Sequence, residues 1–135
     1  MKRYLLDTNI VSYFIRGVDT SLTERVGREM LAQTAAISVI TRAELRFGQA
    51  ALAPDDRRRR AVDLCLNQLM VLPWTSAAAD IFGTVKHQLK RKGLQTGDMD
   101  TLIAVHALAE KLILVTHNTR HFENIADLAL EDWMV

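Results

Sequence analysis

The chain has 135 residues, of which 49% are hydrophobic and 24% are charged. This length suits one domain with its own core, and the composition excludes a disordered tail, a collagen-like chain and a coiled coil. The 17 basic and 16 acidic residues give a net charge of +1, so the bulk charge points to no class of partner. We therefore predict a single domain that spans residues 1–135.

Three sequence features bear on where the protein works. The apolar runs are far shorter than the roughly 20 residues that a membrane-spanning helix needs. The first residues lead directly into a short apolar run and lack the long apolar core of a signal peptide. Cys65 is the single cysteine, which excludes an internal disulfide and a four-cysteine zinc site. We expect a cytoplasmic protein that does not bind a membrane.

Short apolar runs alternate with longer amphipathic segments along the chain. In chain order we predict a strand at 4–6, helices at 10–16 and 21–31, a strand at 35–39, helices at 41–52 and 55–70, a strand at 71–72, helices at 76–92 and 97–110, a strand at 112–115 and an edge strand at 128–130. Short, mostly apolar strands separated by helices are typical of a parallel sheet covered on both faces. The predicted fold class is α/β, a three-layer α/β/α sandwich with a short central parallel sheet.

Polar residues follow the predicted strands at the edge where such sheets bind ligands. Asp7 ends the first strand, and Thr116 follows the strand at 112–115. In open α/β sheets the ligand site lies at the carboxyl ends of the strands, near the point where the strand order reverses. Thr8 and Asn9 can cap the next helix as well as Asp7 can, so we interpret Asp7 as a functional residue that the helix does not need as a cap.

Three further carboxylates are candidates for the same site. Glu44 shares one face of its predicted helix with Ile40 and Phe47, and a carboxylate on an apolar face is rare unless it is paired or bound to a metal. Asp98 and Asp100 open the helix that leads into the strand at 112–115. Residues two apart on a helix point in different directions, so spacing alone does not choose between these two acids.

A cluster of acids favours a divalent cation. Carboxylates brought together repel one another, which raises their pKa values, and a hard cation such as Mg²⁺ or Mn²⁺ removes that penalty. The chain has no HExxH motif and no cysteine cluster, so zinc is disfavoured. We interpret the histidines as surface or rim residues and not as ligands: His87, His106, His117 and His121.

Four segments occur in a characteristic order along the chain: LLDTNIVSYFIRG, ISVITRAELRFG, GDMDTLIAVHALA and LILVTHNTRHF. Together they resemble the PIN-domain ribonucleases, and more narrowly the VapC-type toxins of bacterial toxin–antitoxin pairs. The resemblance covers essentially the whole chain. It implies a Mg²⁺- or Mn²⁺-dependent endoribonuclease that cuts structured RNA, with the anticodon stem-loop of initiator tRNA as the first candidate substrate. It also implies a homodimer and a VapB-type antitoxin whose tail occupies the catalytic groove.

The resemblance assigns roles to individual residues. The acids of the family that bind metal and take part in catalysis fall on three positions: Asp7, Glu44 and Asp100. Residues that can hydrogen-bond to a metal-bound water or to an acid are accessory candidates: Asp98, Thr116 and Asn118. A fourth acidic position of many PIN domains falls near Asn118, and His121 stands where relatives often have an acid. The number of metal ions is therefore left open.

Basic residues outnumber the acids that remain outside the candidate site. With the four candidate acids set aside, 12 acidic residues remain against 17 basic ones. Phosphate contacts dominate affinity for nucleic acids and use such groups. The run at 57–60 suits a solvated helix face as well as RNA, whereas we assign four other residues to RNA binding: Lys90, Arg91, Lys92 and Arg120. The alternative is a PIN-like module that binds RNA or a partner without cutting, although such a module has no use for acids that repel one another.

Overall fold

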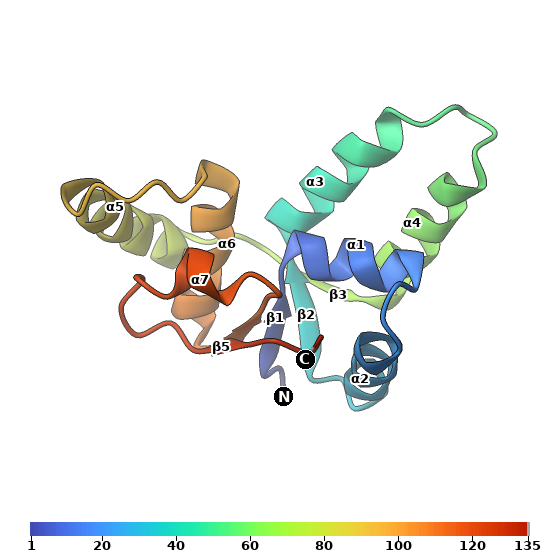
Figure 1. Cartoon of the computed structure of the whole chain (residues 1–135), viewed down its shortest axis with the longest axis horizontal. Coiled ribbons are helices and arrows are strands. Elements are labelled where there is room, and N and C mark those ends of the chain that lie inside the picture. Colours follow the sequence, from blue (N-terminus) through green and yellow to red (C-terminus); the bar gives the residue numbers. More distant parts are fainter. Residues whose placement is uncertain (135) are drawn as a thin grey trace.

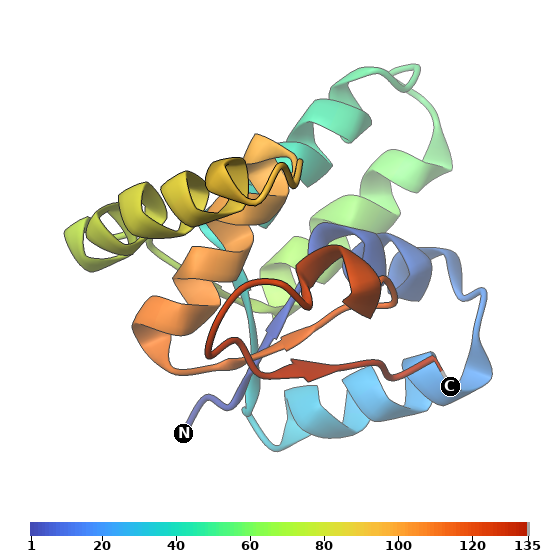
Figure 2. The same cartoon turned by 60° about the vertical axis from the view of Figure 1, so that its left-hand side comes forward.

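The computed structural model describes residues 1–134 and contains a five-stranded parallel sheet with helices on both faces (Figures 1 and 2). The order of the strands is β3-β2-β1-β4-β5. In this part of the chain the elements are β1 (Tyr4–Leu6), α1 (Thr8–Arg16), α2 (Thr20–Leu31), β2 (Ala35–Ser38), α3 (Val39–Ala50), α4 (Arg57–Gln68), β3 (Met70–Leu72), α5 (Ser76–Arg91), α6 (Asp98–Glu110), β4 (Ile113–Val115), α7 (Thr119–Phe122) and β5 (Leu130–Glu131). The predicted α/β/α sandwich is confirmed.

The central strand β1 shows how the three layers arise. Successive side chains of a strand point to opposite faces of the sheet. Tyr4 and Leu6 pack on the face that α1, α2 and α4 cover, whereas Leu5 packs on the face that α5 and α6 cover. All of β1 is buried, which is why its sequence is a continuous apolar run and not an alternating one.

The transition from β2 to α3 positions one side of the sheet edge. Ser38 ends the strand and caps the helix, because its Oγ accepts the backbone N–H of Ile40 at 3.0 Å. The helix therefore starts at Val39, a residue predicted to belong to the strand. Figure 1 shows α3 and α4 rising from the sheet as a hairpin, with α5, α6 and α7 on the opposite side of the molecule.

None of the helices within residues 1–134 combines the length and the apolarity needed to cross a bilayer.

Two of the element boundaries that differ from the prediction have clear reasons. Helix α4 begins at Arg57 and not at residue 55, because the Asp56 side chain accepts the backbone N–H of Arg58 at 2.9 Å and caps the helix there. Strand β5 spans Leu130–Glu131 and not 128–130, because the sheet register pairs Leu130 with Leu114. A helix cap and the pairing with a neighbouring strand thus set the ends of these two elements, which the apolar pattern of the sequence does not define.

Helix α7 has no counterpart among the predicted elements. It is a single turn, and its N-cap residue, Asn118, makes no side-chain capping hydrogen bond. The buried Phe122 anchors the turn in the core that packs against α5 and α6. Tertiary packing therefore forms this turn, in a segment that carries no local helix signal.

Candidate active site

The carboxyl ends of three neighbouring strands carry polar residues at the same level of the sheet. The register pairs Leu6 of β1 with Ile37 of β2 and with Val115 of β4. The residues that follow these partners therefore lie side by side, and all are buried: Asp7, Ser38 and Thr116. The strand order reverses next to β1, and this is the position where open α/β sheets bind their ligands.

Asp7 serves both the helix and the sheet edge. Its side chain is the N-cap of α1, with Oδ1 accepting the backbone N–H of Ile10 at 2.8 Å. The expectation that the helix does not need Asp7 as a cap is wrong, because Thr8 and Asn9 already lie inside the helix. The residue is 5% exposed, so the carboxylate sits in the rim of the core and not in bulk water.

The electrostatic state of Asp7 reflects this position. Its pKa rises from the usual 3.8 to about 6, and burial is the largest cause. Hydrogen bonds from the Thr116 hydroxyl and the Ile10 N–H oppose the rise, while the charges of Asp100 and Glu44 add to it. Asp100 and Glu44, which are far from Asp7 in sequence, are therefore close enough in space to affect its ionisation.

Glu44 is held by hydroxyl groups on the other side of the sheet edge. Its Oε1 accepts a hydrogen bond of 2.6 Å from Thr8 Oγ1, and the Thr8 hydroxyl also hydrogen-bonds with Thr41 Oγ1 at 3.1 Å. The expected apolar surroundings are wrong, because Phe47 on the same helix is 82% exposed. Hydroxyl groups on α1 and α3 thus hold Glu44 in place, and an apolar helix face does not surround it.

Asp100 comes from the opposite half of the molecule, in the first turn of α6. Its Oδ2 lies 3.0 Å from His121 Nε2, and the carboxylate side chain is 43% exposed. His121 belongs to α7, the turn that the sequence did not predict. The imidazole therefore orients one of the candidate acids from a position at the rim of the site.

Asp98 has a different partner. Its side chain is 73% exposed and forms an ion pair with Lys86 of α5. Asp98 is absent from the principal groups that perturb Asp7, in contrast to Asp100. The structure brings Asp7, Glu44 and Asp100 together, and it directs Asp98 toward a lysine.

The two remaining accessory candidates lie after β4. Thr116 is fully buried, and its Oγ1 accepts the backbone N–H of Asn118 at 3.1 Å. Asn118 is exposed at the start of α7. Thr116 therefore links the loop after β4 to the carboxylate of Asp7, whereas Asn118 makes its contact through the backbone.

Two contributors to the site have no distinct signal in the sequence. Ser38 and His106 are both fully buried, and His106 Nδ1 lies 2.7 Å from Ser38 Oγ. The interpretation of His106 as a surface or rim residue is wrong, and burial lowers the pKa of its imidazole. This contact joins α6, which carries Asp100, to the start of α3, which carries Glu44. The position of Ser38 between a strand and a helix is the only hint of its capping role.

The basic residues assigned to RNA are all exposed, at the end of α5 and on α7: Lys90, Arg91, Lys92 and Arg120. The run at 57–60 is partly structural. Arg58 pairs with Asp56 at 2.7 Å, and Arg59 Nη1 donates to the carbonyl oxygens of Gln49 and Leu52 at 2.9 and 3.1 Å. Arg59 thus joins the start of α4 to the end of α3, whereas Arg58 pairs with the N-cap residue of its own helix.

The arrangement of the acids limits how a metal could bind. Within residues 1–134, no three His, Cys, Asp or Glu side chains are placed to hold one ion by direct contacts alone. Mg²⁺ keeps several of its waters and often takes only one or two carboxylates from the protein. The all-oxygen donor set and the raised pKa of Asp7 fit such a hydrated ion, which would relieve the repulsion among the acids.

Comparisons with known proteins show the family to which this chain is similar. The PIN domain family matches residues 4–128. A curated relative from Rickettsia felis, named Ribonuclease VapC2, is 36% identical over 96% of this chain and 97% of its own length. A relative from Shigella flexneri, named tRNA(fMet)-specific endonuclease VapC, is 34% identical over 98% of this chain and 99% of its own.

A solved structure extends the likeness to three dimensions. The crystal structure of DNA-bound VapBC from Salmonella typhimurium superposes with a TM-score of 0.91 at 33% identity, covering 98% of this chain and 99% of that one. Sequence and fold agree over almost the full length. The chain therefore belongs to the PIN-domain family, as a relative of the VapC ribonucleases.

Proposed function

We propose that this chain is a metal-dependent endoribonuclease that hydrolyses RNA phosphodiester bonds at the edge of the sheet formed by Asp7, Glu44 and Asp100. The observation that carries the proposal is the state of Asp7, a buried carboxylate whose pKa is raised by burial and further by two other acids. Burying a charge is unfavourable unless a partner compensates for it. Catalysis explains why a protein would keep a buried carboxylate beside two other acids.

Asp7, Glu44 and Asp100 would hold a Mg²⁺ or Mn²⁺ ion, which supplies a bound water of lowered pKa and positive charge beside the phosphate oxygens. The protein's own groups fix the acids in place. The Thr8 hydroxyl orients Glu44, and His121 orients Asp100. The backbone N–H of Ile10 holds Asp7.

We propose tRNA as the substrate, with the anticodon stem-loop of initiator tRNA as the first one to test. The name of the Shigella flexneri relative supports this choice, since that protein is a tRNA(fMet)-specific endonuclease. The exposed basic residues at the end of α5 support an interaction with a polyanion on the same side of the molecule as Asp100.

The decisive experiment is cleavage of purified tRNA by the purified chain with Mg²⁺ or Mn²⁺, beside EDTA. We expect discrete fragments that disappear with EDTA and in Asp100→Asn. Asp80→Asn is the matched control, because Asp80 is an exposed acid on α5 outside the site. Equal cutting by wild type and Asp100→Asn would contradict the assignment. No cutting by the folded protein would favour the RNA-binding or partner-binding module.

We also propose that a VapB-type antitoxin neutralises the chain. The Salmonella typhimurium relative was solved as a VapBC complex. In this chain a cleft of about 410 Å³ lies between α1, α3 and α4 and includes Thr8, Glu44 and Leu52. An antitoxin segment that fills this cleft would cover Glu44. Coexpression with a VapB-type antitoxin should give a stable complex that no longer cuts tRNA, and activity that survives in such a complex would contradict this proposal.

We also propose that the chain forms a homodimer. Phe47 and Val39 of α3 are 82% and 38% exposed, and a second copy of the chain would cover such apolar side chains. Sedimentation equilibrium should find a dimer for the wild type and a monomer for Phe47→Glu. A monomeric wild type would contradict it.

A further inference from the structure

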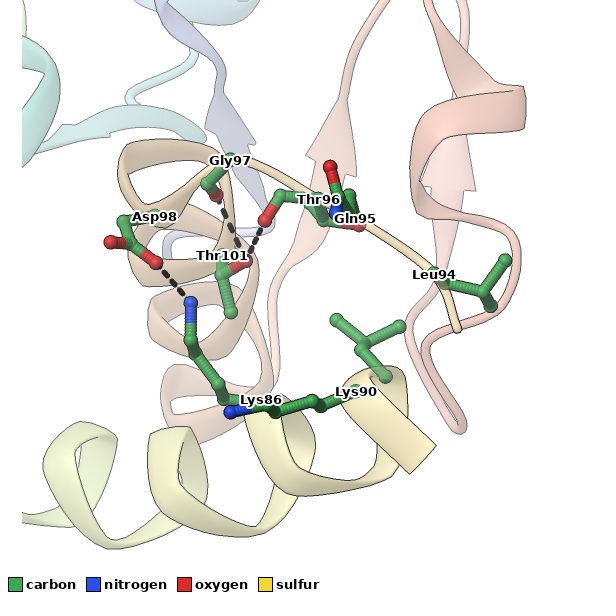
Figure 3. A pocket seen from close by; sticks show the side chains of 9 residues that line it. Lys86, Lys90, Leu94, Gln95, Thr96, Gly97, Asp98 and Thr101 are labelled. Carbon is green, nitrogen blue, oxygen red and sulfur yellow. Dashed lines mark hydrogen bonds and ion pairs between the residues drawn. The ribbon is translucent and has the colours of Figure 1, made fainter. Parts of the chain in front are cut away.

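A second cavity lies beside the candidate active site (Figure 3). It has a volume of about 510 Å³ and is bounded by α5, by the loop that follows it and by the first turn of α6. Figure 3 shows Lys86 extending from α5 toward Asp98 on the facing helix, which also carries Thr101, while Lys90 lies along α5. Asp98 stands two residues before Asp100, so this cavity adjoins the acids that we assign to catalysis.

The walls of the cavity are held by hydrogen bonds. Gly93 ends α5 with a φ of +71°, and the backbone N–H of Leu94 then donates to the Leu89 carbonyl at 2.9 Å. On the facing side the buried Thr101 hydroxyl bonds to the Gly97 carbonyl at 2.9 Å and lies 3.4 Å from the Thr96 carbonyl (Figure 3). The loop is therefore shaped before any ligand arrives.

The charges in the cavity are only partly satisfied. Lys86 pairs with Asp98, and both side chains are well exposed, at 44% and 73%. An exposed ion pair contributes little net free energy, so an anion can replace Asp98 at low cost. Lys90 also lines the cavity and is exposed, and no ion pair to it is found among residues 1–134. Two lysines and one aspartate thus line the cavity.

We propose that this cavity binds a phosphate group of the RNA chain that neighbours the scissile one, through Lys86 and Lys90. Asp98 is the counter-ion of Lys86 in the free protein, and the RNA phosphate displaces it. This inference rests on the proposed nuclease function. It gives Asp98 a role in RNA binding and removes it from the metal site, which agrees with its ion pair to Lys86.

The test measures RNA affinity without cleavage, in an Asp100→Asn background, with fluorescently labelled tRNA and anisotropy between about 50 and 200 mM salt. Lys86→Met and Lys90→Met should each raise the Kd about fivefold and reduce the slope of log K against log salt by about one. Asp98→Asn should do the opposite and lower the Kd about twofold, because it frees Lys86 for the phosphate. Lys2→Met is the matched control, since it removes one exposed charge at the opposite end of the strands.

Two results would overturn the inference. One is an unchanged Kd in both lysine variants while the wild type still cuts tRNA. That result would keep the proposed nuclease function and refute only the proposed phosphate site. The other is a loss of Mg²⁺-supported cleavage when Asp98→Asn is made in the chain that keeps Asp100, together with unchanged RNA affinity in the Asp100→Asn background. That result would return Asp98 to the metal site. If the wild type cuts no RNA, the proposed function fails and this inference fails with it.

Discussion

Two acids of this molecule, both near the proposed site, are accommodated in opposite ways. Asp7, at the end of β1, is 5% exposed and receives hydrogen bonds from neutral donors, the Ile10 N–H and the Thr116 hydroxyl. Asp98, in the first turn of α6, is 73% exposed and pairs with Lys86. The exposed Asp98 has a lysine as its counter-ion, whereas within residues 1–134 none of the principal groups that shift the pKa of the buried Asp7 is basic, and this pKa rises to about 6. The presence of an acidic residue near the site is therefore weak evidence of function. An acid that is buried without a basic partner is stronger evidence.

The strongest way to test this contrast is to neutralise Asp7 without disturbing its helix. Asn caps helices as well as Asp does, so Asp7→Asn should keep the fold and lower tRNA cleavage about 100-fold or more. Asp7→Ala should lose the same activity and, in addition, about 1 kcal/mol of stability with the cap. Cleavage rates and urea unfolding separate the two effects. An active Asp7→Asn would show that Asp7 serves only the helix.

The pH dependence of stability probes the same carboxylate in the metal-free protein. The folded-state pKa of about 6 lies above the ordinary 3.8, so the folded chain binds this proton more tightly than the unfolded chain. The stabilisation by that proton is complete below about pH 4 and is lost as the pH rises through about 6, a change of about 3 kcal/mol. The free energy of unfolding, measured in EDTA from pH 4 to 7, should therefore fall across this window.

Asp7→Asn is the control for the pH experiment, because it removes this titration and leaves every other group in place. The difference between wild type and variant should vary with pH, and a constant difference would contradict the raised pKa. Adding Mg²⁺ at pH 7 should restore part of the lost stability in the wild type and none in Asp7→Asn.

The contrast between buried and exposed positions extends to helix caps. Ser38 caps α3 and also meets the buried His106, so Ser38→Ala removes a cap and leaves the imidazole Nδ1 without its partner. We expect a loss of about 3 kcal/mol, from the cap and the buried polar atom together. Thr75→Ala, at the cap of α5, should lose about 1 kcal/mol or less. Equal losses in urea unfolding would show that the His106 contact contributes nothing.

The smallest effect is expected at an exposed glycine of α5. A Cβ added at Gly83 of α5 meets no atom within 4 Å, and the backbone there is helical. Gly83→Ala should stabilise the protein by about 0.5–1 kcal/mol and leave cleavage unchanged. Thermal unfolding measures this gain. A loss of stability would mean that the outer face of α5 is packed against something, such as a second copy of the chain.

The sequence by itself determined the layers and most of the strands. Strands such as 4–6 and 112–115 are short continuous apolar runs, because both faces of a parallel sheet are buried. The same pattern located Asp7 at the end of β1, and a resemblance over four segments distinguished Asp100 from Asp98. These conclusions depend on local composition and chain order, which a sequence records directly.

Only the tertiary structure decided the surroundings of the site residues. Whether an acid is buried beside other acids, like Asp7, or paired with a lysine, like Asp98, depends on helices far away in the chain. The buried contact of His106 with Ser38 joins residues 68 positions apart, and α7 exists because Phe122 is packed into the core. Periodicity describes which way a side chain points from its own helix or strand. It does not describe what another element places there.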